Sequence, residues 1–172
     1  QDRAATSLTA QIMKSGFFQQ LRTEAQLGYV VASFDWPQMD VPGLVMLVQS
    51  PVADAQVLAT AMQAYMEGVV PDLDAGHLAR HKRARLSGIR RPDKTLWERA
   101  EFYWQSIAKK HWDFDGREAL AAAVEALTLE SWTDYYNRVF MQQRHSLQVV
   151  APGRWGNLPE GEFRHYRSAT AL

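Results

Sequence analysis

The sequence contains no cysteine, so none of its 172 residues can form a disulfide, a thiol nucleophile or a cysteine-based zinc site. It also lacks an excess of either charge, because 19 basic residues balance 19 acidic ones. A net charge of zero argues against a dedicated nucleic-acid binder or a protein that binds anionic membranes. No apolar run approaches the roughly 20 residues that span a bilayer, and the polar first residues lack the hydrophobic core of a signal peptide.

What remains is an ordinary globular composition with 47% hydrophobic residues, enough for one domain with a core. Apolar residues at three- and four-residue spacing predict helices in most of the chain. We expect them at 5–27 with an interruption at Ser15-Gly16, and at about 58–69, 75–88, 96–107, 115–126 and 128–139. Three polar sites are expected to cap helices at their first turns: the segment Pro71-Asp72-Leu73-Asp74, Asp115 and Thr128.

Runs of β-branched and aromatic residues predict strands at 29–34, 44–49 and 146–150. The first two are close enough to form an antiparallel hairpin, and the second is apolar on both faces, so we expect both of its faces to be covered. Together these elements predict an α+β domain. Its sheet is small and mainly antiparallel, with the helices packed against one face.

One corner of this fold carries the main candidate site. Arg22 is expected near the end of a helix and Tyr29 at the start of the next strand, with Gly28 as a left-handed helix stop between them. A guanidinium with five fixed donors and a phenol can both bind a peptide carbonyl or an oxyanion. The alternative is structural: a salt-bridged helix arginine and a core tyrosine.

The residues of this corner read F-F-x-x-L-R-T-E-x-Q-L-G-Y from Phe17 to Tyr29. This motif resembles a signature near the C-terminal end of the pitrilysin and insulin-degrading-enzyme family of zinc peptidases. The likeness continues through 45–51, 89–94, 103–104 and 114–115, and it covers about residues 5 to 151. The resemblance implies the last domain of a longer enzyme: a partial insulinase-type domain at 1–151, incomplete on its N-terminal side, followed by a polar tail at 152–172.

In that family the N-terminal half holds zinc through two histidines and a glutamate, so the resemblance implies no metal in this chain and no activity of this chain alone. It assigns Arg22 and Tyr29 to substrate orientation and transition-state stabilisation. The implied partners are a peptide substrate and the zinc-bearing half of the same enzyme. Two alternatives stay open: the peptidase that processes the pyrroloquinoline quinone precursor, and a metal-free family member that only binds peptides. By resemblance we prefer a bacterial periplasmic location, with the cytoplasm as the alternative.

Two histidines four residues apart, His77 and His81, could in principle share a zinc ion on one helical face. Arg80 stands where an H-x-x-E-H peptidase has its catalytic glutamate, so we favour a non-metal histidine pair. The other histidines show no ligand spacing: His111, His145 and His165.

The segment from His77 to Arg91 is basic and contains no acidic residue. We favour a solvated helix face or an inter-domain contact there over a nucleic-acid patch, because the net charge is zero. A wall that attracts acidic peptides is a third reading. Six aromatic residues at helical spacing are interpreted as core rather than as a ligand box: Trp97, Trp104, Trp112, Trp132, Tyr135 and Tyr136.

Overall fold

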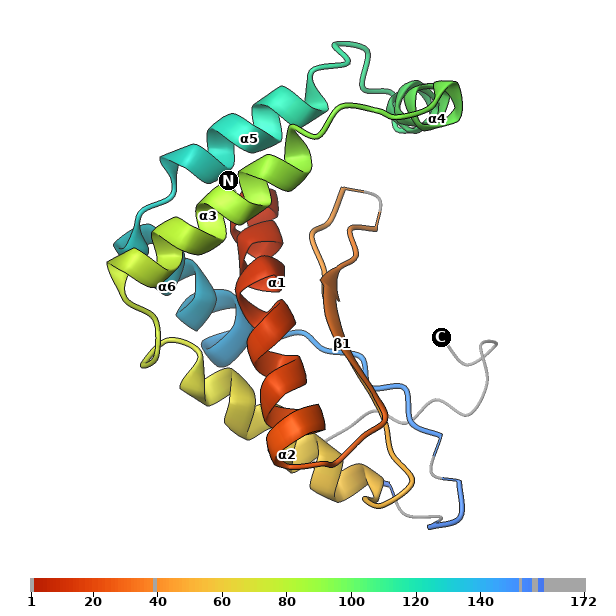
Figure 1. Ribbon diagram of the computed structural model, residues 1–172, viewed down its shortest axis with the longest axis vertical. Helices are drawn as coiled ribbons and strands as arrows, with labels where there is room; N and C mark the ends of the chain where they lie inside the picture. Colours follow the sequence, from red (N-terminus) through yellow and green to blue (C-terminus); the bar gives the residue numbers. More distant parts are fainter. Residues whose placement is uncertain (1, 39, 152, 156–157, 160–172) are drawn as a thin grey trace.

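The computed structural model describes residues 2–38, 40–151, 153–155 and 158–159. Its elements in chain order are α1 (Asp2–Phe18), the π-helix η1 (Gln19–Glu24), β1 (Val30–Asp35), β2 (Leu44–Gln49), α2 (Ala55–Gly68), α3 (Ala75–Ile89), α4 (Leu96–Ala108), α5 (Gly116–Ala126), α6 (Leu129–Tyr136) and the π-helix η2 (Asn137–Gln142). Helix α1 runs through the middle, with the sheet on one side and α3, α5 and α6 on the other (Figure 1). The predicted α+β class is confirmed. No helix in the described ranges is both long and apolar enough to cross a membrane.

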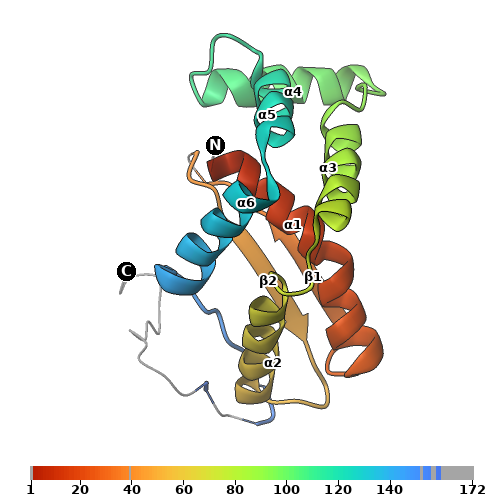
Figure 2. The ribbon, with the colours of Figure 1, turned by 90° about the vertical axis from the view of Figure 1, so that its left-hand side faces the viewer.

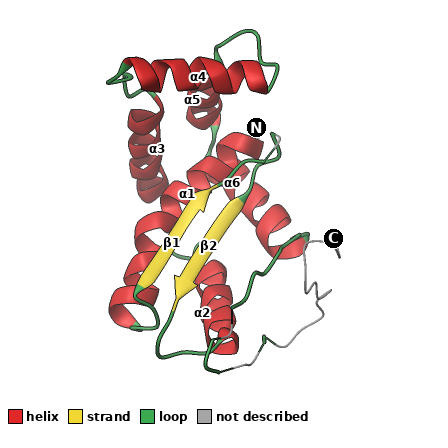
Figure 3. Cartoon of the chain, turned by 90° about the vertical axis from the view of Figure 1, so that its right-hand side faces the viewer, coloured by secondary structure: helices red, strands yellow, loops and turns green. Residues whose placement is uncertain are grey.

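The sheet is the predicted antiparallel hairpin, with Ala32 of β1 opposite Leu47 of β2. Side chains alternate between its two faces. Val31 and Ser33 are buried on the face that packs against α1. The other face is open: helices lie behind the sheet and none lies in front of it (Figure 3), and Phe34 and Leu47 are exposed there. Our expectation that the second strand is covered on both faces is therefore wrong for the described residues.

The core is organised around α1. Leu8 and Ile12, four residues apart, are buried as their spacing predicts, and Phe17 on the opposite side of the helix is buried as well. The polar residue Thr9 is buried too, because it has partners: its hydroxyl donates to the Ala5 carbonyl, and the Trp132 indole N–H donates to Thr9 Oγ1 at 3.1 Å. A buried polar group that is hydrogen-bonded in this way costs little. The helix therefore joins the sheet to α6 through both apolar and polar contacts.

Helix α1 is not interrupted at Ser15-Gly16, contrary to the sequence-based prediction, and continues to Phe18. Gly16 has a packing role instead. A Cβ atom at this position would lie 2.7 Å from the hydroxyl oxygen of Tyr65, which donates a hydrogen bond to the Met13 carbonyl. Burial raises the pKa of Tyr65 to about 12, so this phenol stays protonated and remains a donor at neutral pH.

The six aromatic residues predicted as core divide into two groups. Trp132, Tyr135 and Tyr136 of α6 are buried, as expected. The prediction is wrong for Trp97, Trp104 and Trp112, which are exposed. These three lie on α4 and just after it, and Figure 2 shows α4 lying across one end of the molecule, beyond the ends of α3 and α5. An apolar stripe on a helix indicates that this face is covered, but it does not indicate which part of the protein, or which partner, covers it.

The third predicted strand, 146–150, does not form in the structure. Leu147 and Val149 of this segment are 75% and 88% exposed. A strand needs a neighbour to satisfy its backbone groups, and no described segment pairs with this one. The predicted polar tail, 152–172, lies largely outside the described residues.

Candidate functional site

The corner between α1 and the sheet begins with a change of helix type. At η1 the backbone widens to a π-helix, and the Ala25 N–H donates to the Gln20 carbonyl at 2.9 Å. Leu21 is buried and fixes this turn to the core. Arg22 follows it directly and is exposed, and it makes no ion pair within the described part of the chain. π-Helical turns are rare and are often found at functional sites.

The turn that follows η1 differs from the predicted one. Gln26, and not Gly28, takes the left-handed conformation, with φ of 51°. A glycine is needed at position 28 because there is no room for a side chain, and not because of its φ angle. A Cβ atom there would lie 2.7 Å from Val48 Cγ1 and 3.0 Å from the Gln49 carbonyl oxygen. A left-handed non-glycine residue costs about 1–2 kcal/mol, so this corner carries some backbone strain between Arg22 and the sheet.

Tyr29 is held by its backbone and free at its side chain. Its N–H donates to the Gln49 carbonyl at 3.0 Å, one residue before the first β1–β2 pair. The residue as a whole is 53% exposed. Arg22 and Tyr29 therefore both lie at the surface of one short helix-to-strand corner, and neither is a core residue. The structural alternative of a salt-bridged arginine and a core tyrosine does not describe them.

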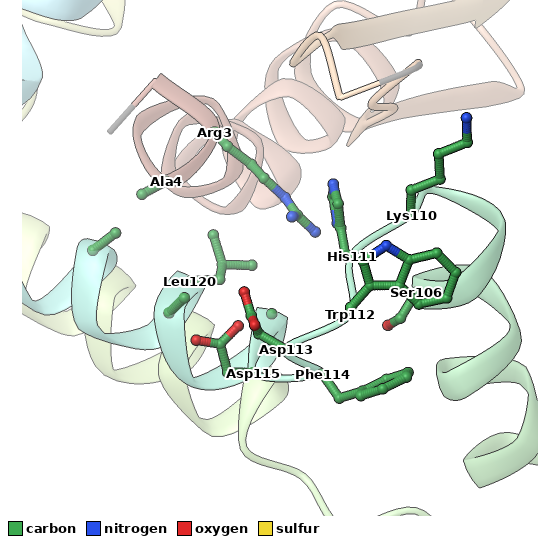
Figure 4. A pocket seen from close by; sticks show the side chains of 13 residues that line it. Arg3, Ala4, Ser106, Lys110, His111, Trp112, Asp113, Phe114, Asp115 and Leu120 are labelled. Carbon is green, nitrogen blue, oxygen red and sulfur yellow. The ribbon is translucent and has the colours of Figure 1, made fainter.

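One hollow of the domain lies away from this corner. It has a volume of about 460 Å³ and lies between the start of α1, the start of α5 and the α4–α5 loop. Figure 4 shows Arg3 and His111 extending into it, with Asp113 and Asp115 on its other side. His111 also pairs with Asp40 at 3.0 Å. Neither Arg22 nor Tyr29 lines this hollow.

Comparison with known proteins identifies the family. Residues 8–104 match the family model described as "PQQ synthase PqqF-like, C-terminal lobe domain 4". The chain belongs to this family. Among curated proteins it is similar to Protease 3 of Salmonella typhi, with 27% identity over 142 residues, 81% of this chain and 15% of that protein. It is also similar to Coenzyme PQQ synthesis protein F of Pseudomonas syringae pv. tomato, with 32% identity over 115 residues, 64% of this chain and 14% of that protein.

Among solved structures, the domain is similar to the crystal structure of pitrilysin, with a TM-score of 0.72 and 26% identity. That match covers 80% of this chain and 15% of the pitrilysin chain. The predicted resemblance to the pitrilysin family is thus confirmed. The chain spans about 15% of the length of Protease 3, so its homologues are larger peptidases of which this domain matches one part.

The histidine pair of this PqqF-like domain does not combine into a metal site in the structure. His77 Nδ1 lies 3.0 Å from Asp74 Oδ2, the same carboxylate that caps α3. His81 is partly buried, and burial together with the neighbouring cation Arg80 lowers its pKa. In the described ranges, no group of three or more His, Asp or Glu side chains is arranged to hold a metal ion.

The basic segment binds other elements of the domain. Arg85 of α3 donates to Ser7 of α1 at 2.5 Å and to Asp35 at the end of β1 at 3.0 Å. Lys82 donates to two carbonyls at the end of α5 and just after it, and Arg90 pairs with Glu125 at 2.7 Å. Half-buried hydrogen-bonded ion pairs such as Arg85–Asp35 restrict geometry more than exposed pairs do. These cations therefore fasten α3 to α1, β1 and α5.

Sequence reasoning missed two exposed apolar surfaces, the open sheet face and the outer side of α4. The signal for the first was present, because Phe34 and Leu47 fall on the same face once the hairpin register is known. The signal for the second was the number of tryptophans on one helix. Both were interpreted as covered because apolar side chains usually are.

Proposed function

We propose that this domain holds the main chain of a peptide substrate for a zinc metalloendopeptidase whose cleaving residues lie on another part of a longer polypeptide. Arg22 donates to a carbonyl oxygen of the peptide. Tyr29 donates to the oxygen of the scissile carbonyl as that oxygen gains negative charge. A donor aimed at developing charge favours the transition state over the substrate, and it therefore raises kcat.

The observation that carries this proposal is the placement of Arg22 and Tyr29. Both side chains are exposed, and Arg22 has no intramolecular ion pair in the described residues, so both are available to a ligand. Their backbones are fixed on either side, by the buried Leu21 and by the bond from Tyr29 to Gln49. Because the backbone is already ordered at both positions, binding has to order only the two side chains. The open sheet face beside the corner offers an apolar surface to substrate side chains.

Zinc, the metal implied by the family resemblance, does not fit the described residues of this chain. The candidate pair from the sequence is His77 with His81, and Arg80 between them would place a cation beside the metal. A cation there would oppose the negative charge of an activated water. We therefore assign the metal and the general base to the N-terminal half and derive no chemical step through this domain's own histidines.

Metal analysis and peptide hydrolysis test this division of labour. The purified 172-residue chain is expected to retain no stoichiometric zinc and to hydrolyse no peptide, because the cleaving groups lie elsewhere. The longer polypeptide is expected to hydrolyse peptides, to lose activity with a chelator and to regain it with zinc. One tightly bound zinc per isolated chain, or hydrolysis by that chain, would contradict the proposal. A longer polypeptide that binds peptides without cleaving them would favour the metal-free binding module.

A narrower function is favoured by the family description and by the 32% identity to Coenzyme PQQ synthesis protein F. In this second proposal the longer enzyme processes the precursor peptide of pyrroloquinoline quinone. The same corner would hold the precursor's main chain, since contacts with a main chain do not depend on the peptide sequence. The ratio of kcat/KM for the precursor to that for unrelated peptides of equal length separates the two functions.

A further inference from the structure

Helix α4 is unusual in this domain because none of its 13 residues is buried. It is nevertheless rich in large apolar side chains. Leu96, Trp97 and Trp104 are 86%, 76% and 63% exposed, and Ile107 is exposed as well. An isolated helix of this length is marginal in water, and contiguous exposed aromatic surface marks an interaction site more often than a free surface.

The side of α4 that faces the domain can be identified from its contacts. The guanidinium carbon of Arg117 on α5 lies 4.4 Å from the centroid of the Phe102 ring. Ser106 lines the hollow beside α5. Consecutive residues of a helix are roughly 100° apart. Trp104 therefore lies on the side opposite Phe102, and Trp97 on the side opposite Ser106. The tryptophans face away from the domain to which α4 is attached.

The start of α4 is firmly held. Asp93, whose side chain is only 6% exposed, pairs with Arg117 of α5 at 2.6 Å and with Arg99 of α4 at 3.0 Å. The Arg117 bond is the main cause of the lowered pKa of Asp93. Thr95 caps the helix by accepting from the Glu98 N–H at 3.1 Å. These bonds join the start of α4 to α5, which sets the direction in which the tryptophan face leaves the domain.

The exposed area of the tryptophan side of α4 indicates what kind of partner covers it. We define the α4 face as Leu96, Trp97, Ala100, Trp104 and Ile107. The two tryptophans and Leu96 expose on the order of 500 Å². A stable interface between separate proteins needs roughly 800 Å² on each side, whereas domains of one chain pack through about 600–1,500 Å² in total. A covalently linked domain is already at high effective concentration, so the smaller face suffices. A second copy of the chain would need more area than this face offers.

We propose that the α4 face is the docking surface for an adjoining domain of the same polypeptide, which buries Trp97 and Trp104 in an apolar surface of its own. This inference rests on the proposed function in one respect, because both require that the domain is part of a longer polypeptide. It is supported by the family model, whose description places domain 4 in a C-terminal lobe, and by the 15% of Protease 3 that the chain spans. Dense aromatic residues with few charges are typical of the centre of a lasting interface.

Hydroxyl-radical footprinting of tryptophan side chains tests the docking directly. Trp97 and Trp104 are expected to be oxidised several-fold more slowly in the longer polypeptide than in the 172-residue chain, while the buried Trp132 stays slow in both. Equal rates for Trp97 and Trp104 in the two proteins would overturn the proposal. Protection in the 172-residue chain that grows with its concentration would overturn it too, in favour of self-association.

A paired substitution gives an independent measurement. The double variant Trp97→Gln with Trp104→Gln is expected to lower the Tm of the longer polypeptide by about 4 °C or more and to leave that of the 172-residue chain unchanged. Val57→Gln, which alters an exposed apolar residue of α2, is expected to change neither. An equal fall in Tm for the double variant of both proteins would overturn the proposed docking. Peptide hydrolysis is measured on the same samples, so an inactive polypeptide with protected tryptophans contradicts only the proposed function.

Discussion

Replacing Tyr29 by phenylalanine is expected to lower the kcat of the longer peptidase by about 10²- to 10³-fold, the usual cost of removing one donor to an oxyanion. The change deletes a single oxygen atom. The backbone bond from Tyr29 to Gln49 remains, and the side chain is half exposed, so the domain should keep its fold. KM should change little, because the lost hydrogen bond strengthens only as the carbonyl oxygen gains charge. Steady-state kinetics on a defined peptide, with circular dichroism of the variant, measures both.

Tyr103→Phe is the matched control for this substitution. Tyr103 is also exposed at its side chain, and its ring packs edge-on against Phe114 at 5.5 Å, on α4 and away from the corner. The same oxygen is removed, so kcat should stay within about twofold of the parent, as expected for a surface change that disturbs no specific contact. An unchanged kcat for Tyr29→Phe, or an equal fall for both variants, would show that the Tyr29 phenol has no special role.

Replacing Trp132 by alanine is expected to lower the free energy of unfolding of the 172-residue chain by about 3–5 kcal/mol. Trp132 is fully buried, its ring centroid lies 5.2 Å from that of Tyr136, and its indole N–H binds Thr9. The substitution leaves a large cavity between α1 and α6 and removes one partner of a buried hydroxyl. Domains have only about 5–15 kcal/mol of stability in all, so this loss is a substantial share of the total. Urea denaturation followed by circular dichroism measures the loss.

Trp97→Ala provides the comparison on the same chain. Trp97 is mostly exposed in the isolated domain, so its removal should change the free energy of unfolding by no more than about 0.5 kcal/mol. Losses of similar size for both tryptophans would mean that α4 packs more tightly than the structure indicates. A loss below about 1 kcal/mol for Trp132→Ala would contradict the central place of α6 in the core.

Local signals in the sequence predicted local structure well. Asp74 and Thr128 cap α3 and α6 as expected, by accepting from the His77 and Ser131 N–H groups. The hairpin also followed from composition and loop length. Asp115 is an exception, because it precedes α5 without a side-chain cap bond. Asp74 and Thr128 succeed as signals because a short side chain with an acceptor oxygen can reach the free N–H groups of the first helical turn.

The remaining differences arise where one residue type serves several physical purposes. Gly28 was interpreted as a left-handed stop, but the structure uses its missing side chain to let Val48 and Gln49 approach, and Gln26 takes the left-handed turn. Gly16 likewise makes room for Tyr65. A single sequence does not distinguish a glycine that is needed for φ from one that is needed for space.

The candidate site followed from a family motif more than from the residues themselves. An arginine on a helix and a tyrosine beside a strand are common, and alone they favoured a structural interpretation. The structure adds that both side chains are exposed at one corner. The aromatic residues of α4 were assigned to the core and the segment 146–150 to a strand, because a sequence pattern reports the need for a partner but not the partner's location.

Photo-crosslinking from position 29 tests the central claim most directly. A benzophenone amino acid replaces Tyr29 in the longer peptidase, and the control protein carries it in place of the exposed Val57 on α2. We predict that a labelled peptide substrate is cross-linked at position 29 and not at position 57. Excess unlabelled peptide, added before irradiation, should prevent the cross-link at position 29. Absence of a cross-link at position 29, or equal labelling at both positions, would contradict a role for this corner in binding the substrate.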